Sequence, residues 1–469
     1  MKTKQKIFFR ADAGAQIGYG HFIRTLALAD MLRNDFDCTF FTQSPSEYQQ
    51  REIEKVCSLV CLPSDDSKFE KFLDYLTGKE IVVLDNYFYT SKYQKQIKKN
   101  GCKLVCIDDM HNRHFYADLI INHGNATQML YDAETYTRFC IGPTYALLRK
   151  PFLIPTSDVG NTKGKWVVCF GGTDSNNLTE KAVKALSVRE DVCKISAIVG
   201  DVYAHKDALS RYDKVTILSN LTAEEMAEQY QTAECVLCSA SSVSYEALAC
   251  GCNVFAGFYI DNQVDFYEGL CNNNLITPLG NLLDTDFITS LNKQAASTNK
   301  MNIHNASRNL LAAFKGLDLR IVNYTDMTLC ESRKVWEVRN LPEIRKCMTQ
   351  SEPFSFESHQ CFVRSLRTNT TKLYYAIFKN DELVGSYDFV GIRDGESAEH
   401  GLYINPAYHG KGFATTIEYM MDGYICERGV TRILAEVLKS NPTSYYYHIK
   451  VGYEVYQEDE KYYYLERYI

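Results

Sequence analysis

The sequence lacks the features that mark several large classes of protein. None of its apolar runs is long enough to cross a bilayer, and its polar start is too short to predict a signal peptide. An excess of positive charge is also missing, and the net charge of -7 gives no reason to expect a nucleic-acid partner. Internal repeats and low-complexity tracts are absent. We therefore expect a cytoplasmic protein without membrane or nucleic-acid partners, whose oligomeric state the sequence leaves open.

The composition is that of a globular protein with several domains. Of the 469 residues, 45% are hydrophobic and 23% are charged, which supplies ample material for buried cores. A length of roughly 100 to 200 residues per domain predicts about three domains.

The seventeen cysteines could suggest a zinc site, because two close pairs resemble the halves of one (Cys235 with Cys238, Cys250 with Cys252). The first pair, however, lies in a strand-like run, where the side-chain alternation points the two thiols to opposite faces. We therefore predict no metal site and interpret the cysteines as small buried residues in a reducing compartment.

Two series of short apolar runs, each alternating with helix-like segments, predict two doubly wound Rossmann-like units. A polar stretch from 155 to 165 separates the series, so we place the units at residues 1–154 and 155–317. Two such units joined by a linker form a cleft, with ligands expected at the carboxyl ends of the strands. The predicted strands are 7–9, 38–41, 81–84, 104–107 and 119–121, followed by 166–170, 195–199, 215–217, 235–239 and 253–256.

The character of the chain changes near residue 318. Two helical segments are followed by antiparallel-looking strands at 374–378, 383–390, 400–404, 432–437 and 462–466. This order predicts a separate α+β domain at 318–469.

A glycine-rich turn with Gly18 and Gly20 joins the first predicted strand to the helix-like segment 22–32 and places His21 at the helix start. The turn lets a ligand approach the backbone, and the helix dipole favours an anion there while disfavouring imidazolium. His21 is therefore a candidate neutral base beside a phosphate-friendly turn. The alternative is a histidine that only caps its helix and packs.

Three further segments follow predicted strands of the second unit. Gly171 and Gly172 offer amides to a diphosphate, or form only a tight turn. Ser242 allows close approach, and Glu246, one helical turn later, could accept hydrogen bonds from ribose or belong to a solvated helix face. Asn262 and Gln263 could hold sugar hydroxyls or a water, or serve as turn residues. The three segments described in this paragraph are 171–174, 239–246 and 261–263.

These motifs together resemble, over about the first 300 residues, the UDP-sugar hydrolases of the pseudaminic acid pathway, which are relatives of the GT-B glycosyltransferases. The resemblance implies that water cleaves the anomeric C–O bond of a UDP-linked sugar and releases UDP without a metal. It implies His21 as the base, Tyr87 as the residue that places the water, and Asn262 on the sugar side. It also implies that the two units form a GT-B-like cleft in which the second unit holds UDP. The segments that carry this resemblance are 10–12, 16–24, 106–109, 112–113, 142–149, 170–179 and 239–246.

A second glycine turn, at Gly410 and Gly412, leaves a strand and opens a helix, so its amides could cradle a pyrophosphate. With the downstream residues 441–453, it resembles the GNAT acetyltransferases, and the similarity extends back to residue 319. The resemblance implies acetyl-CoA as cosubstrate and a UDP-linked aminosugar as acceptor. It implies the cosubstrate contacts Ile404, His409, Gly410, Gly412, Ala414 and Asn441.

Two positions depart from the GNAT pattern. His409 stands where Gln or Arg is usual, and His448 aligns with the tyrosine that protonates the departing thiolate, directly after Tyr447. Adjacent helical residues point about 100 degrees apart, so only one of them can act; Tyr447 is slightly favoured. Glu399 and His400 are both open as the base for the acceptor amine.

Both resemblances point to consecutive steps on one nucleotide sugar. The predicted function is N-acetylation of the 4-amino group of a UDP-aminosugar, followed by hydrolysis to UDP and 2,4-diacetamido-2,4,6-trideoxy-L-altrose. The alternatives are a GT-B glycosyltransferase, a UDP-sugar sensor fused to an acetyltransferase, and acylation of another amine.

Overall fold

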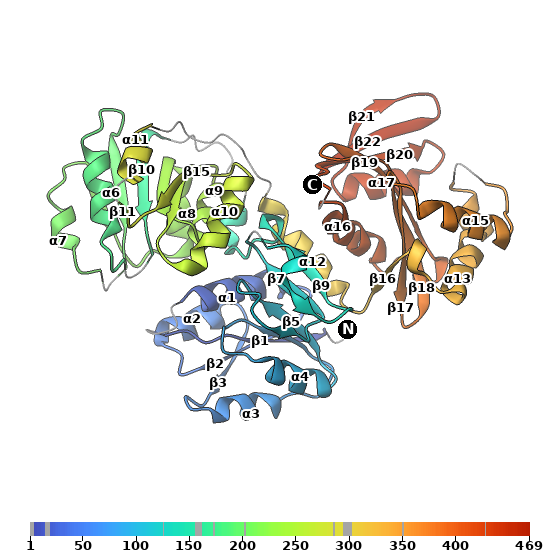
Figure 1. The fold of residues 1–469 in the computed structure, drawn as a ribbon, viewed down its shortest axis with the longest axis horizontal. Helices are drawn as coiled ribbons and strands as arrows, with labels where there is room; N and C mark the ends of the chain where they lie inside the picture. Colours follow the sequence, from blue (N-terminus) through green and yellow to red (C-terminus); the bar gives the residue numbers. More distant parts are fainter. Residues whose placement is uncertain are drawn as a thin grey trace. The chain divides into compact units, whose positions relative to one another are not determined.

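The computed structural model describes residues 4–14, 19–124, 126–154, 162–171, 174–200, 203–284, 287–293, 303–348, 351–426 and 428–469. The chain divides into two compact units, Met1–Leu310 and Leu311–Ile469 (Figure 1). No helix in the described ranges is long and apolar enough to cross a membrane.

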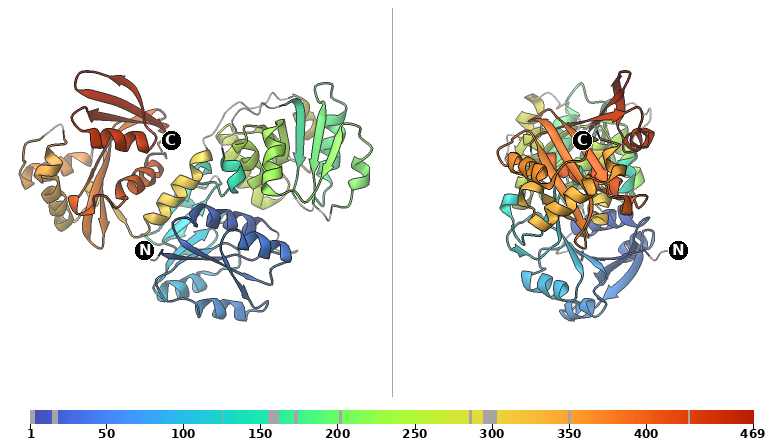
Figure 2. Two further views of the ribbon diagram at one scale, coloured as in Figure 1. Left: turned by 180° about the vertical axis from the view of Figure 1, so that it is seen from behind. Right: turned by 90° about the vertical axis from the view of Figure 1, so that its right-hand side faces the viewer.

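The first unit contains two parallel sheets, as predicted. The first has the strand order β3-β2-β1-β4-β5-β7-β9, with α1 and α2 on one face and α3 and α4 on the other (Figures 1 and 2). Its strands are β1 (Lys6–Arg10), β2 (Asp37–Gln43), β3 (Ser58–Leu62), β4 (Ile81–Leu84), β5 (Lys103–Ile107), β7 (Leu119–Asn122) and β9 (Arg138–Ile141). Its helices are α1 (Gly20–Leu32), α2 (Glu47–Glu54), α3 (Ser67–Leu73), α4 (Ser91–Lys99) and α5 (Lys150–Leu153). Two short strands, β6 (His114–Phe115) and β8 (Asp132–Ala133), pair with each other. The segments η1 (Gln128–Leu130) and η2 (Pro143–Tyr145) are short 3-10 helices.

The second parallel sheet has the order β12-β11-β10-β13-β14-β15. Its strands are β10 (Thr162–Cys169), β11 (Lys194–Ile198), β12 (Val215–Leu218), β13 (Ala233–Ser239), β14 (Asn253–Phe258) and β15 (Thr277–Asn281). Its helices are α6 (Leu178–Ser187), α7 (Lys206–Leu209), α8 (Ala223–Gln231), α9 (Ser242–Ala249), α10 (Val264–Asn272) and α11 (Phe287–Lys293), with the turns η3 (Asp261–Gln263) and η4 (Ile303–Asn305). Helix α12 (Ala306–Lys315) spans the boundary between the two units. Strand order reverses between β1 and β4 and between β10 and β13, and ligands of doubly wound sheets bind beside such reversals.

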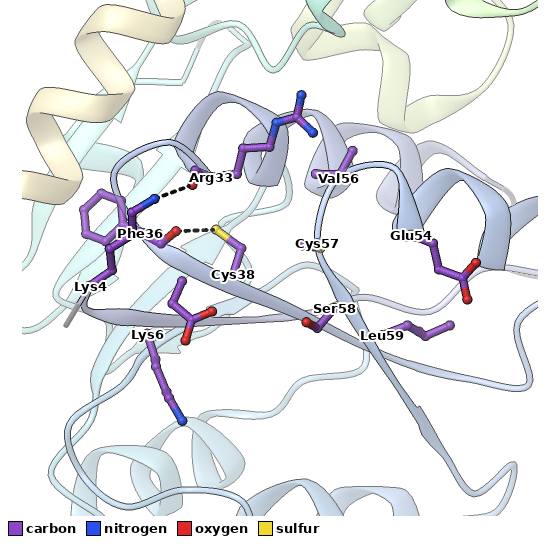
Figure 3. A pocket seen from close by; sticks show the side chains of 11 residues that line it. Lys4, Lys6, Arg33, Phe36, Cys38, Glu54, Val56, Cys57, Ser58 and Leu59 are labelled. Carbon is purple, nitrogen blue, oxygen red and sulfur yellow. Dashed lines mark hydrogen bonds between the residues drawn. The ribbon is translucent and has the colours of Figure 1, made fainter. Parts of the chain in front are cut away.

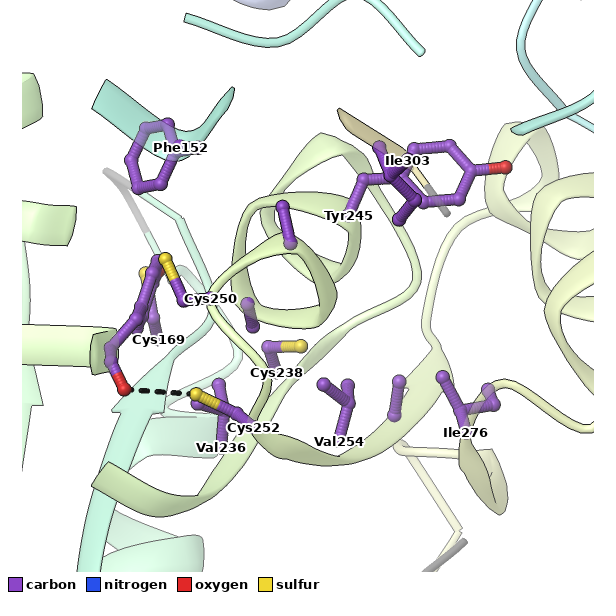
Figure 4. Close-up of a cluster of buried hydrophobic side chains, with 14 of the residues drawn as sticks. Phe152, Cys169, Val236, Cys238, Tyr245, Cys250, Cys252, Val254, Ile276 and Ile303 are labelled. Carbon is purple, nitrogen blue, oxygen red and sulfur yellow. Dashed lines mark hydrogen bonds between the residues drawn. The ribbon is translucent and has the colours of Figure 1, made fainter. Parts of the chain in front are cut away.

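The cysteines of the second sheet belong to its cores. Cys238, Cys250 and Cys252 pack with Phe152, Tyr245 and Val254 on one face of the sheet (Figure 4), whereas Cys235 packs in the cluster on the other face. The predicted alternation of Cys235 and Cys238 is thereby confirmed. Burial raises the pKa of Cys235, Cys238 and Cys250 to about 12, so these thiols stay protonated at neutral pH.

The unit Leu311–Ile469 is built on a third sheet, which has the strand order β16-β17-β18-β19-β20-β22-β21. Its strands are β16 (Arg320–Asn323), β17 (Leu373–Lys379), β18 (Glu382–Arg393), β19 (Ser397–Ile404), β20 (Arg432–Leu438), β21 (Glu454–Glu458) and β22 (Tyr462–Tyr468). One apolar cluster joins α16 and α17 to one face, and a second joins α13 and α15 to the other. The helices are α13 (Leu329–Arg339), α14 (Pro342–Arg345), α15 (Phe356–Leu366), α16 (Phe413–Cys426) and α17 (Pro442–Lys450), with the turns η5 (Tyr324–Asp326) and η6 (Pro406–Tyr408).

One strand pair of this sheet differs from the antiparallel pattern that the sequence suggested. β19 and β20 are parallel, because α16 carries the chain back across the sheet between them. They pair only from Ser397 to Glu399 and from Arg432 to Leu434, although both strands continue beyond these residues. The two strands therefore separate after Glu399.

Candidate active sites

His21 lies at the start of α1, as predicted, and is buried at 7% exposure. Its Nδ1 is 2.7 Å from Oδ1 of Asp85, which directly follows β4. A carboxylate can only accept a hydrogen bond, so Nδ1 carries the proton and Nε2 keeps its lone pair. This tautomer suits a base. Gly20 has open space where a side chain would project, while Gly18 lies outside the described residues.

Asp85 is fully buried and held by three side chains of α1. Besides His21, Arg24 donates from Nη2 to Oδ1 at 2.6 Å and from Nε to Oδ2 at 2.7 Å, and Thr25 donates to Oδ2 at 2.8 Å. Burial acts to raise the pKa of Asp85, but Arg24 and His21 outweigh it and hold that pKa well below its usual range. Asp85 is therefore a permanent anion that can stabilise a protonated His21.

Tyr87 reaches the same cluster through a second carboxylate. Its ring meets that of His21 edge-on, with centroids 4.6 Å apart, and its hydroxyl donates to Oδ2 of Asp109 at 3.2 Å. Arg24 donates to the same oxygen at 2.9 Å. Among the described atoms, Oδ1 of Asp109 is buried without a hydrogen-bond partner. The phenol proton is thus committed, which leaves the Tyr87 oxygen as an acceptor.

The sequence alone assigned no role to Asp85, Arg24 or Asp109. The signal was present, because Asp85 and Asp109 each follow a buried strand and Arg24 lies one turn after His21. Their convergence depends on the order of β1, β4 and β5 in the sheet.

The predicted nucleotide contacts lie at the reversal in the second sheet. Gly171 follows β10 with φ +90°, and no atom lies within 4 Å of a Cβ added there. Ser242 is the first residue of α9, where backbone amides are free to meet an anion. Gly172 lies outside the described residues.

Glu246 is buried one turn into α9, where its Oε1 accepts hydrogen bonds from Nε and Nη2 of Arg149 at 3.0 and 2.8 Å. Burial raises the pKa of Glu246, against the opposing effect of Arg149. Gln263 is buried and accepts from the Tyr259 amide at 3.1 Å. The backbone of Asn262 forms part of η3, while its side chain lies outside the described part.

The unit Leu311–Ile469 presents the loop that was predicted to hold a pyrophosphate. Gly410 and Gly412 have φ values of +70° and +82°, and a Cβ added at either meets no atom within 4 Å. Nε2 of His409 is 2.8 Å from the carbonyl of Ile404, so its side chain folds back onto its own loop. The loop opens into α16, and this combination of free amides and a helix start fits an anionic group such as the pyrophosphate of acetyl-CoA.

The two other predicted cosubstrate contacts lie at the starts of helices. Ala414 is the second residue of α16, and its carbonyl accepts a hydrogen bond from the hydroxyl of Tyr447 at 3.2 Å. Asn441 caps α17, where its side chain accepts from the Ser444 amide at 3.2 Å.

Tyr447 and His448 both face a buried cluster around Glu418. The Tyr447 hydroxyl donates to Oε2 of Glu418 at 3.1 Å. His448 donates from Nδ1 to the Ser444 carbonyl at 2.7 Å, and its Nε2 is 3.0 Å from Nε2 of His400. Glu418 also accepts from Tyr453 at 2.7 Å and from Arg467 at 2.9 Å.

This cluster sets the charge of its members. Burial lowers the pKa of His400 to about 4 and also lowers that of His448. Burial, with Glu418 beside it, raises the pKa of Tyr447 well above its usual range. The polar atoms of Tyr447, His400 and His448 are thus mainly engaged with one another and with Glu418.

A cavity of about 770 Å³ lies in the unit Met1–Leu310, away from His21. Lys4, Lys6, Arg33, Cys38 and Ser58 are among its lining residues (Figure 3). Lys6 and Ser58 begin β1 and β3, so the cavity is at the amino ends of the strands, opposite to His21. It does not mark the site, since chemistry in doubly wound folds occurs at the carboxyl ends.

The comparisons with known proteins match the two parts of the chain to different proteins. Residues 340–453 match the profile of the Acetyltransferase (GNAT) family. The uncharacterized protein MJ1062 of Methanocaldococcus jannaschii is 26% identical over 463 residues, or 93% of this chain and 94% of that protein. The UDP-2,4-diacetamido-2,4,6-trideoxy-beta-L-altropyranose hydrolase of Campylobacter jejuni is 28% identical over 274 residues, or 55% of this chain and 93% of the hydrolase.

A third relative is similar to the other part of the chain. The acetyltransferase PseH of Campylobacter jejuni is 27% identical over 147 residues, or 31% of this chain and 92% of PseH. The crystal structure of that species' PseH in complex with acetyl coenzyme A covers 32% of this chain and 98% of its own, with 25% identity and a TM-score of 0.27. The N-terminal part therefore resembles a UDP-sugar hydrolase, and residues 340–453 of the C-terminal part match the GNAT acetyltransferase family.

Proposed function

We propose that this protein catalyses two consecutive steps on one nucleotide sugar. The C-terminal domain transfers an acetyl group from acetyl-CoA to the 4-amino group of a UDP-linked aminosugar. The N-terminal unit then hydrolyses the product, UDP-2,4-diacetamido-2,4,6-trideoxy-β-L-altropyranose, to UDP and the free sugar. The observation that carries the hydrolase half is the His21–Asp85 pair at the carboxyl end of the first sheet.

The chemistry of this pair suits activation of water. Nε2 of His21 takes a proton from water as the oxygen attacks the anomeric carbon, and Asp85 stabilises the imidazolium that forms. The Tyr87 oxygen, whose own proton goes to Asp109, accepts the second hydrogen of the same water. Two acceptors fix the water with a lone pair directed at the sugar.

The leaving group requires stabilisation of negative charge on the diphosphate. Backbone amides at Gly171 and at the start of α9 are suited to this role, because they are oriented before the reaction. Asn262 and Gln263 are assigned to the sugar side, and Glu246 to the ribose. No step needs a metal ion.

A two-product assay tests the proposal. The full-length protein is supplied with the UDP-aminosugar and acetyl-CoA, and CoA and UDP are followed together. We expect CoA to appear first and UDP only after acetylation. Absence of UDP from the pre-acetylated sugar would contradict the hydrolase half, and UDP release only after an alcohol acceptor is added would indicate a glycosyltransferase. His21→Ala serves as the matched control, since it should abolish UDP release and leave CoA release unchanged.

A further inference from the structure

Two carboxylates lie on the face of the third sheet that carries α13 and α15. Asp388 of β18 pairs with Gly401 of β19, and Glu399 pairs with Val390 two positions away, so both side chains project from the same face. The oxygens of Asp388 lie 2.7 and 2.9 Å from the position that a Cβ on Gly401 would occupy. The carboxylate of Asp388 therefore lies over β19, in space that only a glycine leaves open.

The carboxylates stand where β19 and β20 separate. Glu399 is the last residue of β19 that pairs with β20. If the domain is an acetyltransferase, as proposed above, the separated strands expose backbone groups that can hold the acetyl thioester. An acceptor amine that approaches from the α13 face would then meet Asp388 and Glu399.

The surroundings of Asp388 contain polar groups without partners. Among the described residues none donates a hydrogen bond to Asp388 or Glu399, and the buried Nη1 of Arg339 has no hydrogen-bond partner either. Buried polar atoms are nearly always satisfied, so a ligand is the simplest explanation for several unsatisfied groups at one place. An aminosugar offers both the ammonium and the hydroxyl groups that these atoms can bind.

The charges around Asp388 make it a weak acid. Burial and then the neighbouring Glu399 raise the pKa of Asp388 to about 7, against the smaller opposing effects of Arg339 and Lys372. Burial, followed by Glu436, also raises the pKa of Glu399. Tyr374, Tyr324 and Tyr403 are the other titratable groups close to Asp388. A base is most effective when its pKa is close to the working pH.

Among the residues that the structure describes, the opposite face of the sheet offers no comparable base. His400 projects there and is bonded to His448, and burial lowers its pKa to about 4. Its Nδ1 lies 3.7 Å from Glu418, which is itself held by Arg467 and Tyr453.

We propose that Asp388 is the catalytic base of the acetyl transfer and that Glu399 is a positioning residue that keeps Asp388 basic. The acceptor is a primary ammonium, which the two carboxylates attract. One proton passes from the ammonium to Asp388. The nitrogen then forms a bond to the acetyl carbon as the C–S bond breaks, a second proton leaves the nitrogen, and the thiolate takes up one proton to become CoA-SH. The third hydrogen remains on the amide, so one proton is released overall.

The test compares variants of the full-length protein at saturating acetyl-CoA and UDP-aminosugar. For Asp388→Asn we expect kcat for acetylation to fall about 10²- to 10⁴-fold, with loss of the rise in kcat near pH 7. Glu399→Gln should stay active and move that rise to lower pH by about half a unit to one unit, because Asp388 loses a like charge. The matched control is Asp394→Asn, an exposed residue between β18 and β19, which should leave kcat and the profile unchanged.

Two further readouts keep the test decisive. UDP release from the pre-acetylated sugar and the Kd for acetyl-CoA should be unchanged in every variant, which separates a missing base from misfolding. A kcat for Asp388→Asn within threefold of the wild type, or an equal loss in Glu399→Gln, would overturn the assignment of Asp388. If the wild type acetylates no amine, the acetyltransferase proposal fails and the base fails with it. If it acetylates a different amine, the same comparison is made with that acceptor.

Discussion

Nδ1 of His21 lies 2.7 Å from Oδ1 of Asp85, although 64 residues separate them in the chain. The contact fixes the proton of His21 on Nδ1 and leaves Nε2 as a hydrogen-bond acceptor. It joins the start of α1 to the end of β4, the two segments that flank the reversal of strand order in the first sheet.

The first prediction concerns Asp85→Asn. An amide offers one acceptor oxygen to His21, Arg24 and Thr25, where the carboxylate offers two with a full charge. We expect kcat for UDP release to fall about 10²- to 10⁴-fold, with acetylation unchanged. Asp30→Asn, on the same helix and paired with Arg33, is the matched control. Retention of hydrolysis in Asp85→Asn would show that His21 needs no anionic partner.

The second prediction concerns Asp109 and Tyr87, which should act as one unit. Tyr87→Phe removes the acceptor for the water, and Asp109→Asn lets the phenol rotate its proton toward that water. We expect each variant to lower kcat for hydrolysis by about tenfold or more, and the double variant to lose little further. Steady-state kinetics of the three proteins form a double-mutant cycle. Strictly additive losses would mean that the two side chains act separately.

The third prediction concerns Gly412. An alanine there costs about 1–2 kcal/mol of stability through its left-handed backbone, and its methyl group projects into the open space of the loop. We expect the KM for acetyl-CoA to rise about tenfold or more while UDP release is unaffected. Gly395→Ala is the control, because Gly395 has φ +75° and similar open space but lies in the turn between β18 and β19. Equal KM values for the two variants would argue against a cosubstrate role of the loop.

The fourth prediction concerns stability between pH 4 and pH 6.5. Burial lowers the pKa of His123, His359 and His400 to about 4 in the folded protein, whereas unfolded histidine titrates near about 6.5. In this window the unfolded chain binds more protons, so the free energy of unfolding falls as pH falls, by up to about 1.4 kcal/mol per pH unit for each histidine. Four carboxyl groups with raised pKa values, Asp388, Asp108, Glu246 and Glu399, act in the opposite direction. The contribution of one histidine is therefore measured as the change in pH dependence when that histidine is replaced.

Calorimetry at pH 5 and pH 7 measures this dependence. The three histidines are expected to lower the Tm at pH 5 relative to pH 7. His359→Gln should make the dependence shallower, whereas His205→Gln, at an exposed position, should leave it as it is. A pH dependence of Tm that His359→Gln leaves unchanged would be inconsistent with a buried neutral His359.

Much of the secondary structure was predictable from local patterns. Continuous apolar runs located β1, β4, β5, β13 and β14 because strands buried on both faces need apolar side chains throughout. Strands without that signal were missed. β21 is exposed along its whole length and β16 holds only two adjacent apolar residues, so no apolar run marks them. β3 was missed although it contains the short apolar run from Leu59 to Leu62.

The sequence by itself determined the α/β and α+β classes, the two glycine turns and the position of His21 at a helix start, since each depends on neighbouring residues. The tertiary structure alone decided which charges meet. Arg24 contacts Asp85 and Asp109 across 61 and 85 residues, and Asp388 lies beside Glu399 only in the register of β18 with β19. Such pairings depend on strand order and register, which result from the packing of the whole sheet, and local propensity carries no record of them.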